Sequence, residues 1–326
     1  MISPELLHTA AIGAAIVLGG IGSGIGQGIA GLGALQAMSR QTTGHDQIIR
    51  TMVLGLALIE SGVILSLVIT LMMLFGPTQQ LTMGIGLAEL GMGCAIGLSA
   101  LAISIASSFA VKAACESIAR QPFFYQKIIT LMLLAQSIIG APGVFAFIIA
   151  LLIKANTTPT ISDLEGIKYL AAGLTVGIGS IGPSIGQAIF AQSSCYAAGR
   201  NQQAYGKLLT FSLLSQAVIQ TPLIFCLIIA IMIIYKSVAA IAATAGEYAT
   251  LITSASCFAP GFAISVGSLG TAIAIGYAAS KSSYYVVMDE ENYPLFIRTS
   301  LLAQAIIESA AIYALIVALI LVTKSI

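Results

Sequence analysis

Residues 47–75 read QIIRTMVLGLALIESGVILSLVITLMMLF, a long apolar stretch with one acid, Glu60, near its middle. An apolar run of about 20 residues crosses the hydrocarbon core of a bilayer as a helix. A carboxylate at that depth costs roughly 2.5 kcal/mol or more, so an acid inside such a span marks a functional site by default. The stretch therefore predicts a membrane-spanning helix that carries a functional carboxyl group.

The same stretch recurs three times in altered form. It reads KIITLMLLAQSIIGAPGVFAFIIALLI from residue 127, KLLTFSLLSQAVIQTPLIFCLIIAIMII from residue 207, and LFIRTSLLAQAIIESAAIYALIVALIL from residue 295. The position of Glu60 is held in the later copies, in order, by Gly140, Gln220 and Glu308. The acid is thus present in the first and last copies and lost from the two between them.

The composition excludes an ordinary soluble domain. The 326 residues are 58% hydrophobic and 8% charged, which is typical of a polytopic helical membrane protein. A net charge of +1 gives no sign of nucleic-acid binding. The five cysteines lie far apart without metal or disulfide spacing, so we interpret them as small core residues. No pattern for nucleophilic or metal catalysis is present, and we expect no cofactor.

Each acid-position helix is preceded by a helix rich in small residues. The first runs from about Pro4 to Met38 and contains a glycine string: Gly20, Gly22, Gly24, Gly26 and Gly28. A nucleotide-binding glycine loop needs a βαβ frame, whereas this string lies inside a membrane-length apolar run. Residues two apart lie about 200° apart around a helix, so small residues occupy two opposite sides. This arrangement predicts close packing against two neighbouring helices.

Short polar loops join the paired helices into hairpins, of which the first loop is Ser39 to Gln47. The hairpins repeat at a pitch of about 80 residues, which predicts an array of like units. We expect an all-α membrane protein whose eight transmembrane helices form four tandem helical hairpins. Their predicted limits are residues 1–80, 81–160, 161–240 and 241–326.

Lysine and arginine residues orient the hairpins. Nine lie in or near the hairpin loops: Arg40, Arg50, Lys112, Arg120, Lys127, Arg200, Lys207, Lys281 and Arg298. Four lie at the opposite side: Lys154, Lys168, Lys236 and Lys324. The positive-inside rule therefore predicts cytoplasmic hairpin loops and both termini outside.

Hairpin one resembles the c-type rotor proteolipid of F-type ATP synthases. The resemblance is carried together by the glycine string in IGSGIGQGIAGLGALQAMSRQ, the Arg40–Gln41 loop and the mid-helix Glu60. It extends over the whole chain as four fused copies, with loop motifs at Arg120–Gln121 and Arg200. The fourth loop, SSYYVVMDEENYP, departs from the pattern because it is longer and acidic.

The resemblance implies a membrane rotor. Several chains would close into a homo-oligomeric ring in an energy-coupling membrane, most simply a bacterial inner membrane. Its mid-membrane carboxyls would exchange protons or sodium ions with a stator a subunit, and its loops would contact central-stalk subunits. Such a chain is no enzyme on its own. Because fusion with loss of acids is more typical of V-type proteolipids, a ring dedicated to ATP-driven pumping is the alternative.

The resemblance also implies which residues surround the ion. In the family, Gln27 and its counterpart Gln187 lie beside the ion site. Sodium-binding relatives use a hydroxyl directly after the acid and a tyrosine five residues past it. In this chain the hydroxyls are those of Ser61 and Ser309, and the tyrosine is Tyr313. Tyr313 is expected near Glu308.

Further partners are expected at the same depth. A hydroxyl donated by the preceding hairpin would be Ser309 for Glu60 and Thr221 for Glu308. The opposite direction leaves Glu60 facing Ala141, which has no hydroxyl, so we favour the first. Pro142 and Pro222 free the carbonyls of Ile138 and Val218. The resemblance to sodium-binding relatives implies that a backbone oxygen at this spot is a ligand, and the alternative is a simple kink where nothing binds.

Two other functional classes remain to be weighed. A secondary transporter is commonly built on inverted repeats with broken helices, but here each repeat is a two-span hairpin that keeps its orientation. A purely structural ring or pore is disfavoured by the two buried acids.

Overall fold

A computed structural model describes residues 3–76, 81–238, 248–289 and 291–324 of the chain. Within these residues, eight helical segments are long and apolar enough to cross a membrane, as the sequence predicts. The predicted hairpin limits at residues 80 and 240 lie outside the described residues, whereas the limit at 160 lies in the connection between α5 and α6.

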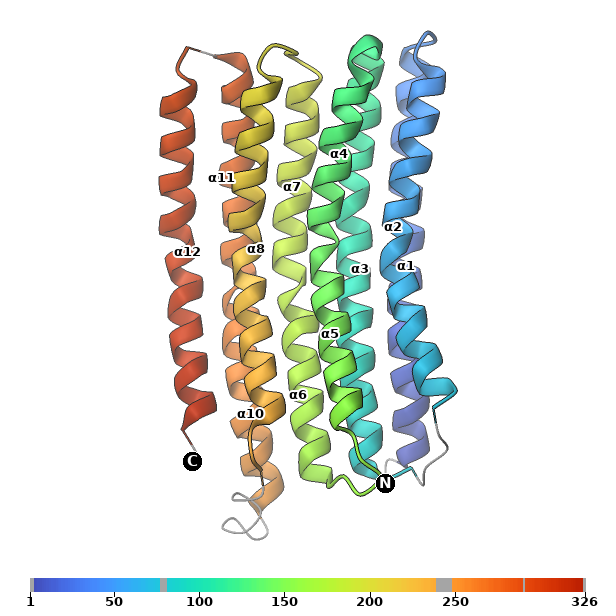
Figure 1. The fold of residues 1–326 in the computed structure, drawn as a ribbon, viewed down its shortest axis with the longest axis vertical. Coiled ribbons are helices and arrows are strands. Elements are labelled where there is room, and N and C mark those ends of the chain that lie inside the picture. Colours follow the sequence, from blue (N-terminus) through green and yellow to red (C-terminus); the bar gives the residue numbers. More distant parts are fainter. Residues whose placement is uncertain (1–2, 77–80, 239–247, 290, 325–326) are drawn as a thin grey trace.

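The helices form two rows (Figure 1). The first helices of the hairpins make one row: α1 (Pro4–Arg40), α3 (Met83–Arg120), α6 (Asp163–Gly179) with α7 (Ile181–Ala198), and α10 (Ala249–Gly267) with α11 (Leu269–Met288). The second helices make the other: α2 (His45–Leu74), α4 (Tyr125–Ile139) with α5 (Ala141–Asn156), α8 (Tyr205–Tyr235), and α12 (Tyr293–Thr323). A short 3-10 helix, Pro122–Phe124, leads into α4.

Each second helix except the last lies in the groove between two first helices. α2 contacts both α1 and α3, and α8 contacts both the α6–α7 and the α10–α11 segments. Among the described residues, α12 has α10 and α11 beside it in the first row and no further first helix. Figure 1 shows both chain ends at one end of the bundle and the hairpin turns at the other.

Close backbone contacts hold the first row together and confirm the packing role of the glycines on the side of α1 that faces α3, whereas Cβ positions on Gly20, Gly24 and Gly28 have nothing within 4 Å. A Cβ placed on Gly26 would lie 2.5 Å from the carbonyl oxygen of Ser104 on α3. A Cβ on Gly91 would lie 2.6 Å from the carbonyl oxygen of Tyr169 on α6. Only glycine permits such approach, as is common where helices pack in membranes.

Three of the predicted continuous helices are interrupted. α4 ends before Gly140, and Pro142 lies just beyond it. The α6–α7 and α10–α11 interruptions fall at Gly–Ser pairs, Gly179–Ser180 and Gly267–Ser268. Helix bends concentrate at prolines and at Gly/Ser pairs, because missing N–H groups and hydroxyls compete with the helical hydrogen bonds.

Candidate ion-carrying site

The acid position lies at mid-span in every hairpin. Glu60 stands at the middle of the 30-residue α2, and Gln220 and Glu308 stand at the middle of the 31-residue helices α8 and α12. Gly140 occupies the interruption between α4 and α5. The four aligned positions thus share one depth in the bundle, as the repeat predicts.

Two hydrogen bonds show which way the acid position faces. The Gln136 Nε2 donates to the carbonyl oxygen of Gly55 at 3.1 Å, and the Gln304 Nε2 donates to Ser215 Oγ at 3.1 Å. Both glutamines lie four residues before an acid position, and both partners belong to the second helix of the preceding hairpin. Residues four apart lie within about 40° of each other around a helix. The acid position therefore faces the preceding hairpin.

The exposure of the aligned side chains agrees with this direction. Gln220, whose preceding hairpin covers it, is 7% exposed. Glu308 is half-buried beside α8, whereas Glu60 is exposed. Among the described residues, no hairpin covers the side of α2 that carries Glu60.

Hairpin three replaces the acid with an amide pair. The Gln187 Nε2 on α7 donates to the Gln220 Oε1 on α8 at 2.6 Å, and both side chains are buried. Their counterparts in hairpin one are Gln27, which is half-buried, and Glu60. The pair shows that a first-helix glutamine reaches the acid position of its own hairpin.

The other two hairpins differ at the glutamine position. Hairpin two has Ser107 there, opposite Gly140, and hairpin four has Ile275, which is fully buried. A carboxylate at Glu308 therefore has no first-helix amide within its own hairpin, unlike the carboxylate at Glu60.

The three hydroxyls of interest each bond to their own helix. Ser61 Oγ donates to the Leu58 carbonyl at 2.7 Å, and Ser309 Oγ donates to the Ile306 carbonyl at 2.7 Å. Thr221 Oγ1 donates to a carbonyl four residues earlier at 3.4 Å. Each oxygen keeps lone pairs with which it can bind a cation.

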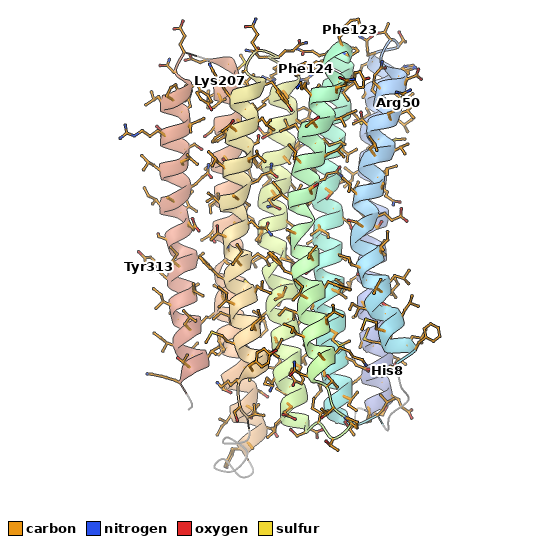
Figure 2. All side chains as sticks on the ribbon, in the orientation of Figure 1. His8, Arg50, Phe123, Phe124, Lys207 and Tyr313 are labelled. Carbon is orange, nitrogen blue, oxygen red and sulfur yellow. The ribbon has the colours of Figure 1, made fainter. Side chains whose placement is uncertain are left out.

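Within the chain, Tyr313 does not point toward α8, and its expected place near Glu308 stays a prediction. Tyr313 is 65% exposed, and Figure 2 shows it projecting away from the helix bundle. Five residues along a helix correspond to a rotation of about 140°, which turns Tyr313 away from the side that faces α8.

The proline-freed carbonyls occur in two different settings. Pro142 has no N–H to offer the Ile138 carbonyl, and the chain bends there, with the Gly143 N–H bonded to the Gly140 carbonyl at 3.1 Å. α8 instead runs through Pro222 without interruption, so the Val218 carbonyl is freed inside a continuous helix.

The loop residues gather at the end of the bundle where Figure 2 labels Arg50 and Lys207. The Arg120 guanidinium lies 5.7 Å from the centre of the Tyr196 ring, and that of Arg200 lies 4.8 Å from the Tyr284 ring. Gln121 Nε2 donates to the Arg200 carbonyl at 3.5 Å, which links the second and third loops.

The first and fourth loops complete this end. Arg40 closes the last turn of α1, and the backbone N–H of Gln41 caps that helix. In the fourth loop, hydrogen bonds from the Asn292 side chain and backbone lower the pKa of Asp289. This loop is acidic in sequence, whereas the first three carry arginine.

The sequence pattern did not predict one polar pair. His8 Nδ1 lies 2.5 Å from Glu89 Oε2, which joins α1 to α3 at the end that holds the chain termini (Figure 2). Glu89 is 5% exposed. The two residues lie 81 positions apart, one more than the repeat pitch. This spacing was the sequence signal that could have indicated their contact.

The fold and the aligned acids together define an integral membrane protein of tandem helical hairpins with mid-span carboxyl groups. Comparison with known proteins identifies the family. The model of the ATP synthase C-subunit family matches four times, over residues 10–73, 90–153, 170–233 and 258–321. The chain belongs to the ATP synthase C-subunit family.

Individual relatives match one hairpin's length. The ATP synthase c-subunit of Dehalococcoides mccartyi strain 195 is 44% identical over 73 residues, 22% of this chain and 96% of the relative. That of Alkaliphilus oremlandii is 46% identical over 71 residues, 22% of this chain and 81% of the relative. That of Thermotoga petrophila is 43% identical over 67 residues, 21% of this chain and 79% of the relative.

Proposed function

We propose that this chain is a membrane rotor subunit of a rotary ATP synthase or ATPase, and that Glu60 and Glu308 carry protons or sodium ions. The observation that carries the proposal is the shared depth and facing of the two carboxyls on second-row helices. A carboxyl in an apolar setting is stable when it is protonated or paired with a cation, so it can load and release an ion where its surroundings change.

In the assembled rotor, several copies form a ring with the first row inside and the second row outside. The stator a subunit supplies the two ion paths, and central-stalk subunits contact the loops around Arg40, Arg120 and Arg200. The hairpin loops face the cytoplasm and both termini face outward. The chain itself performs no chemical catalysis.

The glutamine pair supports a specific site around Glu60. Gln187 reaches Gln220, so Gln27 is placed to donate to Glu60 in the same way. Because the acid position faces the preceding hairpin, the hydroxyl that completes the Glu60 site is Ser309 of a neighbouring copy, and Glu308 receives Thr221 of its own chain. Glu60 is then the better cation site, since Ile275 gives Glu308 no amide.

Reaction with a carbodiimide tests the proposal, because this reagent modifies protonated carboxyl groups in apolar surroundings. In the purified complex, adducts are expected on Glu60 and Glu308, together with loss of ATP hydrolysis. Adducts confined to other acids of the apolar spans, or a purified chain without nucleotide-hydrolysing subunits, would reject it.

A second candidate is a ring dedicated to ATP-driven pumping. Four hairpins share two carboxyls, so one turn moves half the ions that the hairpin number suggests. Each charge gains about 2.3 kcal/mol per 100 mV, so the energy available per turn is also halved and synthesis requires a higher membrane potential. Measuring ATP synthesis and ATP-driven uptake in vesicles at several potentials separates the two directions.

A further inference from the structure

The contact between hairpins one and two is matched in residue size. A Cβ on Gly55 of α2 would lie 2.8 Å from Val111 Cγ1, and a Cβ on Gly62 would lie 2.9 Å from Ser104 Oγ. Each glycine on the second helix thus accepts a larger side chain from the next first helix, α3. These two contacts show how the second helix of hairpin one packs on hairpin two.

The two ends of the chain carry the same positions without a partner. On α12 the counterparts of Gly55 and Gly62 are Ala303, which is half-buried, and Ala310, which is exposed. On α1 the counterparts of Val111 and Ser104 are Gly31 and Gly24, and a Cβ at either would have nothing within 4 Å.

At these two open faces the small and large positions are exchanged relative to the contact between hairpins one and two. At the contact between hairpins one and two the glycine lies on the second helix and the larger residue on the first helix. At the chain ends the alanine lies on the second helix and the glycine on the first helix. Each pair therefore keeps one small partner, which is what close helix packing in a membrane requires.

We propose that these faces meet, so that α12 of one copy packs on α1 of the next with Ala303 against Gly31 and Ala310 against Gly24. The proposal rests on the ring proposed above and adds which hairpins touch. The contact joins two different surfaces of the same chain, which is the heterologous type that closes rings. The occupant of the open α1–α2 face is a second copy of this chain.

This arrangement brings the two acid-bearing hairpins together. Hairpin four of one copy lies beside hairpin one of the next, so Glu308 and the next copy's Glu60 occupy adjacent positions. The two hairpins that follow have no acid. Ion carriers therefore come in adjacent pairs at each boundary between copies, and two loaded hairpins pass the stator before two without an acid.

The members of each pair are chemically different. Glu60 has Gln27 on its own first helix and the neighbour's Ser309 beside it, whereas Glu308 has Ile275. Inside the chain, Leu65 Cδ1 lies 3.6 Å from where a Cβ on Gly143 would be. The same relationship at the boundary places Tyr313 of one copy against Val63 of the next, close to the next copy's Glu60.

Exchanging residue size tests the contact. Gly31→Val alone should reduce the amount of assembled ring at least several-fold on native gels and in native mass spectrometry, because a valine then meets Ala303. The double variant Gly31→Val with Ala303→Gly recreates the Gly55–Val111 pair and should restore the ring. An unaffected ring in the single variant, or no recovery in the double variant, overturns the proposal.

Disulfide formation gives a second, independent measurement. In a chain whose five native cysteines are replaced by alanine, Val63→Cys with Tyr313→Cys should give a ladder of covalently linked copies after oxidation in the membrane. The matched control, Leu65→Cys with Gly143→Cys, should link within one chain and give no ladder. A control that links while the boundary pair does not would show that a different chain or a different face lies there.

These results are separable from the proposed function. If the complex hydrolyses ATP and carbodiimide modifies both acids, yet the boundary pair gives no ladder, the rotor function stands and the pairing fails. If a ladder forms but no nucleotide-hydrolysing subunits accompany the chain, the contact stands and the rotor function fails.

Discussion

Gln187 and Gln220 form a buried hydrogen bond of 2.6 Å at the place where hairpin one has Gln27 and Glu60. An amide in place of the acid keeps the polar partner of the first-helix glutamine but removes the ionisable group. Hairpin three thus keeps the first-helix glutamine contact that we propose for the Glu60 site, while carrying no ionisable group at that position. Hairpin two has lost both parts, since Gly140 and Ser107 stand there.

Gln187→Leu is expected to destabilise the chain by about 1–3 kcal/mol, because Gln220 then lacks its buried partner. Gln187→Leu with Gln220→Leu removes both polar groups and should recover most of this loss. Thermal unfolding of the purified chain in detergent measures both. A double variant as unstable as the single one would contradict this account.

Gln220→Glu should create a third ion carrier. The new carboxyl lies within reach of Gln187, so mass spectrometry after carbodiimide treatment should show an added adduct at residue 220. A hydrogen bond from Gln187 stabilises the charged form of this carboxyl. Labelling needs the protonated form, so it should persist to higher pH in Gln220→Glu with Gln187→Leu. Identical pH profiles would show that the amide does not contact the acid.

Ser309→Ala tests which neighbour completes the Glu60 site. In the ring it should weaken sodium protection of Glu60 against carbodiimide and leave Glu308 nearly unchanged. Ser61→Ala is the matched control: in the proposed arrangement Ser61 serves hairpin two, which has no acid at the aligned position, so both acids should react as in the unaltered ring. If Ser61→Ala changes the labelling of Glu308 instead, the hydroxyl comes from the following hairpin.

Gly26→Leu should destabilise the chain itself. The new side chain meets the α3 backbone, since a Cβ there would already lie 2.5 Å from the Ser104 carbonyl oxygen. Overpacking of this kind costs about 1–3 kcal/mol, and more where backbone cannot move. Gly20→Leu is the control, because nothing lies within 4 Å of its Cβ position. Thermal unfolding of single chains in detergent should separate the two, and equal melting temperatures would contradict the packing assigned to Gly26.

The sequence by itself determined the hairpins, their number and the depth of the acids. Apolar runs of bilayer length and a repeat pitch near 80 residues leave little freedom, because a helix in lipid must satisfy its own backbone hydrogen bonds. The resemblance to the rotor proteolipid of ATP synthases, confirmed by the four family matches, followed from residues that lie close together in the sequence. Gln27 and Glu60 could be predicted as candidate site residues because each belongs to one of these local motifs.

Only the tertiary structure decided which neighbour each helix face meets. The rotation of a helix about its axis depends on contacts between residues far apart in the chain, such as Gln136 with Gly55. Such contacts turned Tyr313 away from α8 and showed that Gln187 bonds to Gln220. Helix interruptions at Gly179–Ser180 likewise depend on local competition for hydrogen bonds, which hydrophobic periodicity does not report. The length of a helix and the membrane depth of its acid depend on that segment alone. The direction in which a side chain points depends on how the helix packs against its neighbour.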